Sequence, residues 1–246
     1  MTNQKFTDLL AKQIPQDSSQ QITSEYYIQH LLQSERSTQK VLDLGCGEGN
    51  SEAKFKACSQ DMQWYGLDID ESPEVNSRSK EGNFYTFDGI NIPFEDNYFD
   101  IIYSNQVFEH VRYPEALLVE INRVLKPGAY FVGSVSYLEP YHSFSFWNYT
   151  PYGFKEIALE AGLEVIEIRP SIDALTLIIR RILGAPKFFS RWWKRESPLN
   201  LLISLAGKIT KKDAASVNAI KLMFCGQFCF LTQKPLDRQT EKNAKI

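Results

Sequence analysis

Residues 41–50, VLDLGCGEGN, carry the strongest structural signal in this chain. The apolar start of this stretch predicts a short buried strand, and glycine then occupies positions 45, 47 and 49. Glycine allows the chain to turn sharply and lets bare backbone approach a ligand, and a helix that follows such a turn offers free N–H groups to an anion. A tight turn would account for one glycine, whereas three predict a ligand-binding loop.

Apolar runs alternate with helical segments along the rest of the chain. Helices are predicted at residues 24–35, 51–58, 114–125 and 150–162. Because strands that alternate with helices pair in parallel, the sequence predicts an α/β fold with a doubly wound, Rossmann-like sheet of about seven strands. These strands are expected at residues 40–47, 62–70, 83–89, 98–106, 129–137, 163–170 and 225–235.

The length and composition fit one domain. The chain has 246 residues, of which 43% are apolar and 23% charged, as in ordinary globular proteins. We expect residues 1–246 to form a single domain with a polar, loosely held start at 1–20 and a helical insertion at 171–224 before the last strand. The core then consists of residues 21–170 and 225–236.

Cysteine usage and hydropathy indicate the cellular compartment. The four cysteines form neither a Cys-x-x-Cys pair nor a disulfide-like pattern, which favours a reducing, cytoplasmic setting. The N-terminus lacks the apolar core of a signal peptide, and no apolar run approaches the roughly 20 residues that a spanning helix needs. We therefore expect a cytoplasmic protein, with contact at the membrane periphery as a further option.

Two further strands end in an acidic residue. Asp68 ends the second strand 19 positions after Gly49, where a carboxylate can accept both hydroxyls of a ribose. Asp88 ends the third strand, where it can receive the exocyclic amine of an adenine. Because ligands bind beyond the carboxyl ends of such strands, these residues predict an adenosine-containing ligand. A nicotinamide cofactor is the alternative, but its Gly-x-Gly-x-x-Gly fingerprint differs from the Gly-x-Gly-x-Gly found after Asp43.

Five segments resemble, in the same order, the class I S-adenosylmethionine-dependent methyltransferases of the methyltransferase domain 11 type. The resemblance spans about residues 38–137. It implies a seven-stranded sheet whose last strand is antiparallel, with S-adenosylmethionine as the cofactor lying over the first strands. The segments that carry it are VLDLGCGEGN, YGLDID, FDG, IPFEDNYFDIIYSNQVFEHV and EINRVLKPGAYFVGSV.

The resemblance also implies roles for individual residues. Asp43 would approach the methionyl part of the cofactor, Asp68 would bind its ribose, and Asp88 its adenine amine. Asn105 and Gln106, at the end of the fourth strand, would face the methionyl amine and the transferring methyl. The full set of expected cofactor-binding residues is Asp43, Gly45, Cys46, Gly47, Asp68, Ile69, Asp88, Gly89, Asn105 and Gln106.

Transfer to a hydroxyl calls for a base, because the hydroxyl proton must leave, and histidine suits this task at neutral pH. His110 follows the fourth strand and His142 the fifth, and both are candidate catalytic residues. The structural alternative for His110 is to hold its loop together, as the matching histidine commonly does in the family. For His142 the alternative is an ordinary surface histidine, which we expect His30 to be. No convincing cluster of acidic metal ligands is found, so no metal is predicted.

The segment after the fifth strand bears on the acceptor. It is similar to that of family members found with bacterial surface-polysaccharide genes, which carry a histidine, an aromatic with Trp, and then Thr-Pro. Tyr141, Trp147 and Tyr149 are expected either to stack on a sugar or to pack beneath the loop. Nucleic acid is disfavoured, because residues 105–108 lack the Asn-Pro-Pro-aromatic motif of base-amine methylases and no basic groove is expected.

Residues 171–212 combine cations with apolar helical positions. Nine Lys or Arg stand there against Asp173 and Glu196, so this segment carries +7 and the rest of the chain −10. Amphipathic helices with Trp beside Arg or Lys are typical of an interfacial membrane segment, and residues 174–212 are therefore expected to contact a membrane surface. A lid over the active site and a dimer interface are the alternatives. The apolar stripe of the first helix consists of Leu175, Ile178, Ile179, Ile182 and Leu183.

Taken together, these features predict an S-adenosylmethionine-dependent methyltransferase that O-methylates a saccharide or a lipid-linked glycan. One alternative is C- or O-methylation of a lipid-like small molecule such as a quinone precursor. Another is a non-catalytic protein that binds the adenosyl group as a scaffold. In the catalytic cases the expected partner is a small-molecule or glycan acceptor.

Overall fold

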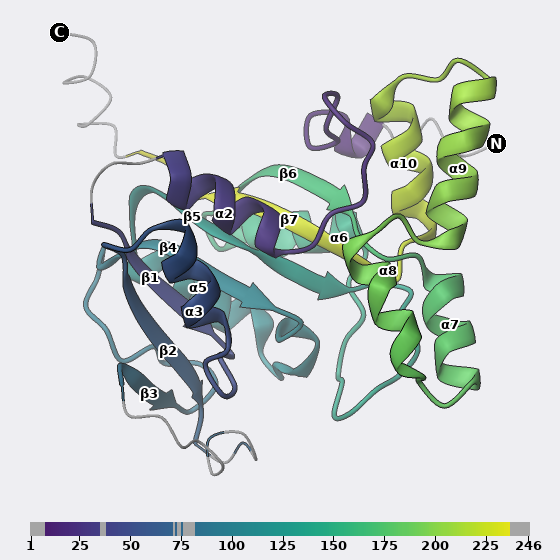
Figure 1. The fold of residues 1–246 in the computed structure, drawn as a ribbon. Helices are drawn as coiled ribbons and strands as arrows, with labels where there is room; N and C mark the ends of the chain where they lie inside the picture. Colours follow the sequence, from purple (N-terminus) through teal and green to yellow (C-terminus); the bar gives the residue numbers. More distant parts are fainter. Residues whose placement is uncertain (1–7, 35–37, 71, 73–74, 76–81, 237–246) are drawn as a thin grey trace, which may run out of the picture.

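One seven-stranded mixed sheet forms the centre of the computed structural model, which describes residues 8–34, 38–70, 72, 75 and 82–236 (Figure 1). The strand order is β3-β2-β1-β4-β5-β7-β6. β7 runs antiparallel to both β5 and β6, whereas the other neighbours pair in parallel, so the predicted sheet with an antiparallel last strand is confirmed. The bounds are β1 Lys40–Leu44, β2 Gln63–Ile69, β3 Phe84–Phe87, β4 Phe99–Asn105, β5 Leu125–Ser136, β6 Glu164–Pro170 and β7 Gln227–Gln233.

Helices cover both faces of the sheet. Successive side chains of a strand point to opposite faces, so Val41 joins one apolar cluster with α2 and α3, and Leu42 joins the other with α5, α6 and α10. Figure 1 shows α2 and α3 in front of the sheet and α5 and α6 behind it. Their bounds are α2 Glu25–Ser34, α3 Ser51–Cys58, α5 Pro114–Val124, α6 Pro151–Glu160 and α10 Ala214–Phe224.

The N-terminal segment is packed more tightly than its composition predicts. Leu10 is fully buried and Ile14 is 5% exposed, both within the cluster on the α5 side. The backbone N–H of Ile168 in β6 donates to the carbonyl of Gln13 at 2.8 Å. The expectation of a loosely held start is therefore wrong from residue 8 onward, because two apolar side chains among the polar ones anchor the segment to the sheet.

The predicted insertion forms a group of helices between β6 and β7. It contains α7 Ala174–Ile182, the 3-10 turn η2 Lys187–Ser190, α8 Arg191–Lys194, α9 Pro198–Ile209 and α10. Figure 1 shows these helices gathered at one end of the sheet, next to the ends of β6 and β7. Within the described residues, none of the helices has the length and apolar character needed to cross a bilayer.

Candidate active site

The glycine loop after β1 turns as the sequence predicts. Gly45, Gly47 and Gly49 all have positive φ, at 74°, 51° and 74°. A Cβ at Gly45 would come within 2.2 Å of a Val107 methyl carbon, so only glycine fits there. The N–H of Gly47 donates to Asp68 Oδ2 at 2.8 Å, which ties the loop to the end of β2. The predicted loop and ribose acid are thus brought together, and Cys46 of the loop is buried.

An exposed apolar side chain and a glycine with open space above it lie beside the loop, at the ends of β2 and β3. Ile69 ends a buried strand yet remains 46% exposed, and the N–H of Ile69 donates to Asp68 Oδ1 at 2.8 Å. Gly89 has φ of 88°, and a Cβ placed on it would meet nothing closer than Ile69 Cγ2 at 3.9 Å. A flat apolar ring fits against such a bare surface, with a carboxylate next to it for ribose hydroxyls. These residues therefore fit the adenosyl part of S-adenosylmethionine.

Asp88 holds its own loop in this structure. One of its carboxylate oxygens accepts the N–H groups of Ile90 and Asn91, at 2.9 and 2.7 Å, and the other accepts the Asn91 amide at 2.5 Å. The Asn91 bonds are the main cause of the lowered pKa of Asp88. Its contact with an adenine amine stays a prediction.

Asp43 is a buried carboxyl group that points toward α3. Only 4% of the residue is exposed, and the Ser51 hydroxyl, at the start of α3, donates to it. Trp64 Nε1 in turn donates to the same hydroxyl at 3.2 Å. Burial raises the pKa of Asp43 to about 7, the Ser51 bond opposes this shift, and the charge of Asp68 adds to it. A cation bound near Asp43 would favour its ionised form.

The two amides at the end of β4 are already engaged by protein partners. Asn105 Oδ1 accepts hydrogen bonds from the hydroxyls of Ser24 and Ser134, at 2.7 and 2.8 Å. Gln106 has φ of 56°, and its amide nitrogen faces the acceptors around it, donating to Glu109 Oε1 at 3.0 Å and to Glu139 Oε2 at 3.1 Å. Their roles toward the methionyl group stay predictions. The structure adds that Gln106 points toward a cluster of acids and histidines on the neighbouring loops.

That cluster lies just beyond the ends of β4 and β5. The two predicted histidines meet there, with the ring centroids of His110 and His142 5.4 Å apart. Glu109 Oε1 is 3.9 Å from His142 Nε2, and Glu139 Oε1 is 3.8 Å from His142 Nδ1. The side chain of Glu109 is fully buried and that of His142 is 21% exposed. The third histidine, His30, lies on the exposed surface of α2, away from this cluster.

Burial changes the acid–base properties of these groups. It raises the pKa of Glu109 to about 7, with the charge of Glu139 adding to the effect and a hydrogen bond from Ser136 opposing it. It also lowers the pKa of His110, an effect that the positive charge of His142 reinforces. Polar groups with such shifted pKa values are typical of catalytic sites.

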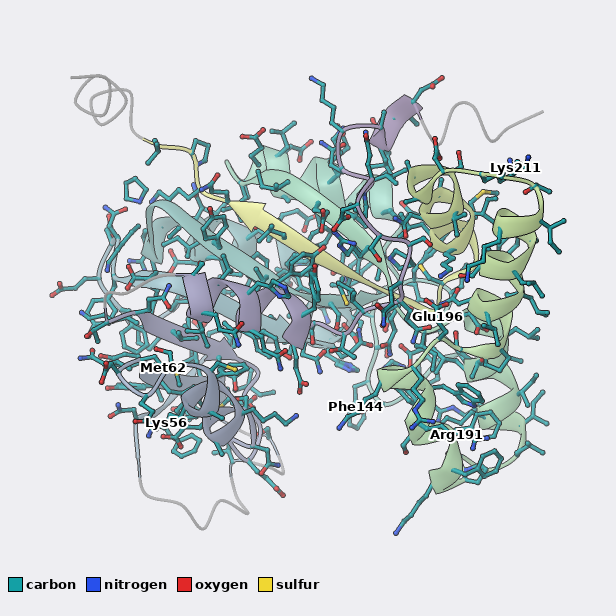
Figure 2. The ribbon with its side chains drawn as sticks, turned by 45° about the horizontal axis from the view of Figure 1, so that its top comes forward. Lys56, Met62, Phe144, Arg191, Glu196 and Lys211 are labelled. Atoms are coloured by element: carbon teal, nitrogen blue, oxygen red, sulfur yellow. The ribbon has the colours of Figure 1, made fainter. Side chains whose placement is uncertain are left out.

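The loop that carries His142 is fixed to the turn that carries Glu109, η1 Phe108–His110. The carbonyl oxygen of Glu109 accepts the N–H groups of Phe146 and Trp147, at 2.7 and 3.2 Å. Tyr149, a candidate for sugar stacking, is instead buried and donates its hydroxyl to the Phe108 carbonyl at 2.9 Å. The exposed aromatic residues of the loop are Tyr141, Phe144, Phe146 and Trp147. Figure 2 shows Phe144 on the side of the sheet that faces α8 and Arg191.

Sequence reasoning missed the two acids of this cluster. Glu109 stands in VFEHV, where a charged residue among apolar ones was a usable signal for burial. Glu139 gives no such signal, because it stands in the loop after β5, where a charged residue is ordinary. The structure also groups Glu109, His110 and His142 so that one ligand atom of each lies within 4.8 Å of the others, an arrangement that the sequence search for metal ligands did not find.

The strand order with its antiparallel β7 is that of the class I methyltransferase fold, and the glycine loop and the strand-end acids lie where S-adenosylmethionine is predicted to bind. Residues 42–133, less than half of the chain, match the family model described as a methyltransferase domain. Use of S-adenosylmethionine as the cofactor agrees with this match and with the residues at the ends of β2 and β3.

Individual proteins support the same assignment. An uncharacterized methyltransferase of Schizosaccharomyces pombe is 30% identical over 126 residues, which cover 44% of each chain. A fatty-acid O-methyltransferase of Mycolicibacterium smegmatis is 25% identical over 200 residues, covering 74% of this chain and 68% of the relative. The chain thus spans less than half of the yeast protein.

Solved structures show the fold. The complex of Haemonchus contortus phosphoethanolamine N-methyltransferase 2 with S-adenosyl-L-methionine superposes with a TM-score of 0.52 at 19% identity, covering 85% of this chain and 52% of that one. A 4+2 cyclase, SpnF, superposes with a TM-score of 0.55 at 16% identity, covering 95% of each chain. Because a cyclase shares this fold, the fold alone does not define the reaction.

Proposed function

We propose that this protein is an S-adenosylmethionine-dependent O-methyltransferase and that its acceptor is a hydroxyl of a lipid-linked saccharide. The observation that carries the proposal is the cluster of Glu109, His110 and His142 beyond β4, next to the cofactor-binding strand ends. The cofactor, when bound, supplies a methyl group on a sulfonium sulfur. On transfer to an acceptor oxygen the cofactor would be left as a thioether, and the hydroxyl proton would pass to a group of the cluster or to solvent.

The chain's own residues divide this work between two regions. The glycine loop and Asp68 orient the cofactor, since alignment of the reacting atoms is a large part of the rate gain in such displacements. The cluster beyond β4 supplies polar groups where the hydroxyl must lose its proton. A neutral nitrogen acceptor has a free lone pair and needs no base before methyl transfer. A site for such an acceptor therefore does not require a buried carboxylate beside two imidazoles.

The saccharide half of the proposal rests on the loop after β5. Its exposed aromatic residues include Tyr141, Phe144 and Trp147, which are 77%, 85% and 47% exposed. Trp147 Nε1 donates to the Val111 carbonyl at 2.9 Å, so its ring is held in one orientation beside the histidine cluster. Aromatic faces of this kind suit the apolar face of a sugar.

The lipid half rests on the insertion, whose apolar positions point outward. On α7 only Ala174, Thr176 and Leu177 are buried, whereas Ile182 is 77% exposed; on α9, Ile209 is 74% exposed. Cations such as Arg180, Lys187 and Lys208 accompany these faces, so a surface of anionic lipid headgroups complements them in both charge and polarity. The further exposed apolar residues are Leu175, Ile178, Ile179, Leu183, Phe188, Leu201, Leu202 and Leu205.

A second candidate function is methylation of a lipid-like acceptor without a sugar. The similarity to a fatty-acid O-methyltransferase, the longest alignment reported above, favours it. Both candidate functions use the same cofactor site and the same insertion. They differ only in the part of the acceptor that contacts the loop after β5, which is a sugar in the first and an apolar chain or ring in the second.

The test uses the full chain with methyl-labelled S-adenosylmethionine and separated pools of lipid-linked glycans, fatty acids and quinone precursors. We expect the label in the glycan pool, and transfer should fail in Trp147→Ala and His142→Ala while calorimetric cofactor binding persists. Label in the sugar-free lipids alone would favour the second candidate. Cofactor binding with no transfer to any pool would favour a non-catalytic scaffold and contradict the proposal.

Membrane contact is tested by flotation with phosphatidylglycerol vesicles and with phosphatidylcholine vesicles. The chain should float with the anionic vesicles, and the double variant Ile182→Asn, Ile209→Asn should remain in the soluble fraction. Val119→Asn, at a site on α5 that is 55% exposed, is the matched control and should float like the parent chain. Equal flotation of the double variant would remove the membrane interpretation and leave a lid or a dimer interface.

A further inference from the structure

Three metal-ligating side chains converge beyond β4 from two separate segments. Glu109 and His110 lie on η1, and His142 lies on the loop after β5. One ligand atom from each lies within 4.8 Å of the others. Two ligands of a Zn²⁺ ion, each at roughly 2.0–2.2 Å from it, are about 3–4 Å apart, so small side-chain rotations suffice to close this set around an ion.

The carboxylate of the set is incompletely satisfied by the protein. Glu109 Oε1 accepts the Ser136 hydroxyl at 3.1 Å, but Oε2 is buried and has no hydrogen-bond partner among the described residues. The whole side chain is shielded from solvent. Burying an acceptor oxygen without a partner is costly unless a ligand supplies the missing interaction.

Both histidines are oriented by contacts of the kind that metal-bound histidines make. His142 directs Nε2 at Glu109, while its Nδ1 lies 3.4 Å from the Pro140 carbonyl oxygen and 3.8 Å from Glu139. His110 hydrogen-bonds to the backbone of Phe144. A ligating imidazole typically donates its second N–H to a carbonyl or a carboxylate, which fixes its tautomer and the direction of its free nitrogen.

We propose that Glu109, His110 and His142 together bind one divalent transition-metal ion. Two imidazoles with one carboxylate favour Zn²⁺, Co²⁺ or Mn²⁺ over Mg²⁺ and Ca²⁺, which prefer oxygen ligands. Three protein ligands would leave a position for an oxygen of the acceptor, and a coordinated hydroxyl would release its proton to solvent more readily. In this arrangement the two histidines are ligands and not bases. The role in methyl transfer rests on the proposed function, whereas the binding of the ion does not.

The test is titration of the metal-stripped full chain with Zn²⁺ alone, followed by calorimetry, and with Co²⁺, followed by visible absorption. We expect one ion per chain and a Co²⁺ spectrum with nitrogen ligands. His142→Ala and Glu109→Gln should each weaken binding roughly 100-fold or more, since even partners one step removed from a metal are worth 10- to 100-fold. His30→Ala, which removes the one other histidine of the chain, should bind like the parent.

Glu109 is buried, so each variant is also checked for its melting temperature. His142 lies on a loop and is 21% exposed on its side chain, and His142→Ala keeps the test decisive if Glu109→Gln does not fold. A parent chain that binds no Zn²⁺, or binding that survives the loss of His142 or depends on His30, would overturn the proposal. Metal binding without methyl transfer to any acceptor would overturn the proposed function and leave the metal site standing.

Discussion

Replacing Asp43 by asparagine should stabilise the cofactor-free protein at alkaline pH and weaken its affinity for S-adenosylmethionine. Asp43 is 4% exposed, and burial is the largest cause of the rise of its pKa from 3.8 to about 7. The charged groups that face it are Asp68 on β2 and, in its ionised form, Tyr103 on β4, and neither is cationic. The ionised carboxylate is therefore unfavourable in the absence of a bound cation.

The magnitude follows from the two pKa values. The pKa of Asp43 is 3.8 in the unfolded chain and about 7 in the folded chain. This difference lowers the unfolding free energy of the parent at alkaline pH by at most roughly 4 kcal/mol. Between about pH 4 and pH 7 the folded state keeps a proton that the unfolded chain releases, so this contribution to stability falls as pH rises through that window. Above about pH 7 both states are ionised and the loss is complete. The asparagine side chain of the variant has no proton to release, so the variant lacks this dependence.

The assay is urea unfolding at several pH values between about 5 and 8.5, followed by tryptophan fluorescence. The difference in unfolding free energy between Asp43→Asn and the parent should be about a third of its upper value near pH 5 and grow to that value near pH 8. Asp70→Asn, which removes an exposed acid after β2, is the control and should show no such growth. Calorimetry at pH 8 should show weaker cofactor binding to Asp43→Asn. Parallel stability curves for parent and variant across the whole range would refute the reasoning.

Two further substitutions test the cofactor site and the sheet. Asp68→Ala should weaken S-adenosylmethionine binding by about 1–3 kcal/mol, measured by calorimetry, since it removes charge-assisted bonds to two hydroxyls; an unchanged dissociation constant would exclude the ribose role. Gly133→Ala should lower the unfolding free energy by at least about 1–3 kcal/mol, because the new Cβ would lie 1.8 Å from the Ser104 carbonyl oxygen across the β4–β5 pair. Gly82→Ala, where the nearest atom is 3.6 Å away, is its control, and equal melting temperatures for the two would contradict this account.

The cofactor side of the site was predictable because its signals are local. A strand, a glycine loop and a strand-end acid follow one another along the chain, and parallel pairing then brings the ends of β1 and β2 together without further information. Asp88 and Gln106 show the limit of this reasoning. Sequence position placed both at strand ends, but the hydrogen bonds that turn Asp88 onto Asn91 and Gln106 toward Glu109 depend on loop conformation.

The acceptor side was predictable only in part, because its residues come from separate loops. Sequence position made His110 and His142 candidate site residues. Their 5.4 Å separation, however, depends on two backbone hydrogen bonds from the loop after β5 to the Glu109 carbonyl.

The apolar stripe on α7 illustrates a different limit of sequence-based prediction. Its amphipathic spacing was evident, but the Asp173 cap and the burial of Ala174 and Leu177 set which side of the helix meets the core. The apolar stripe was left facing outward.

Asp43 and Glu109 share a property that links the cofactor to the proposed metal. Both are buried carboxyl groups at the ends of the adjacent strands β1 and β4, and within the described residues neither pairs with a lysine or an arginine. Buried acids without cationic partners persist where a ligand supplies the charge. Here the positive charge of a sulfonium would compensate the carboxylate of Asp43, and the charge of a divalent ion would compensate the carboxylate of Glu109.

Each ligand should therefore stabilise the folded chain through a different carboxylate. At a concentration 100 times its dissociation constant, a ligand adds about 2.7 kcal/mol to the unfolding free energy. Thermal melting should show that Asp43→Asn diminishes the gain from S-adenosylmethionine and keeps the gain from Zn²⁺, while Glu109→Gln does the reverse. Because Asp43 lies in β1 and Glu109 on η1, and the two make no direct contact among the hydrogen bonds described, the two gains should add in the parent chain. Loss of both gains in either variant would mean that the carboxylates form one coupled site, and the division of the site into a cofactor side and a metal side would be wrong.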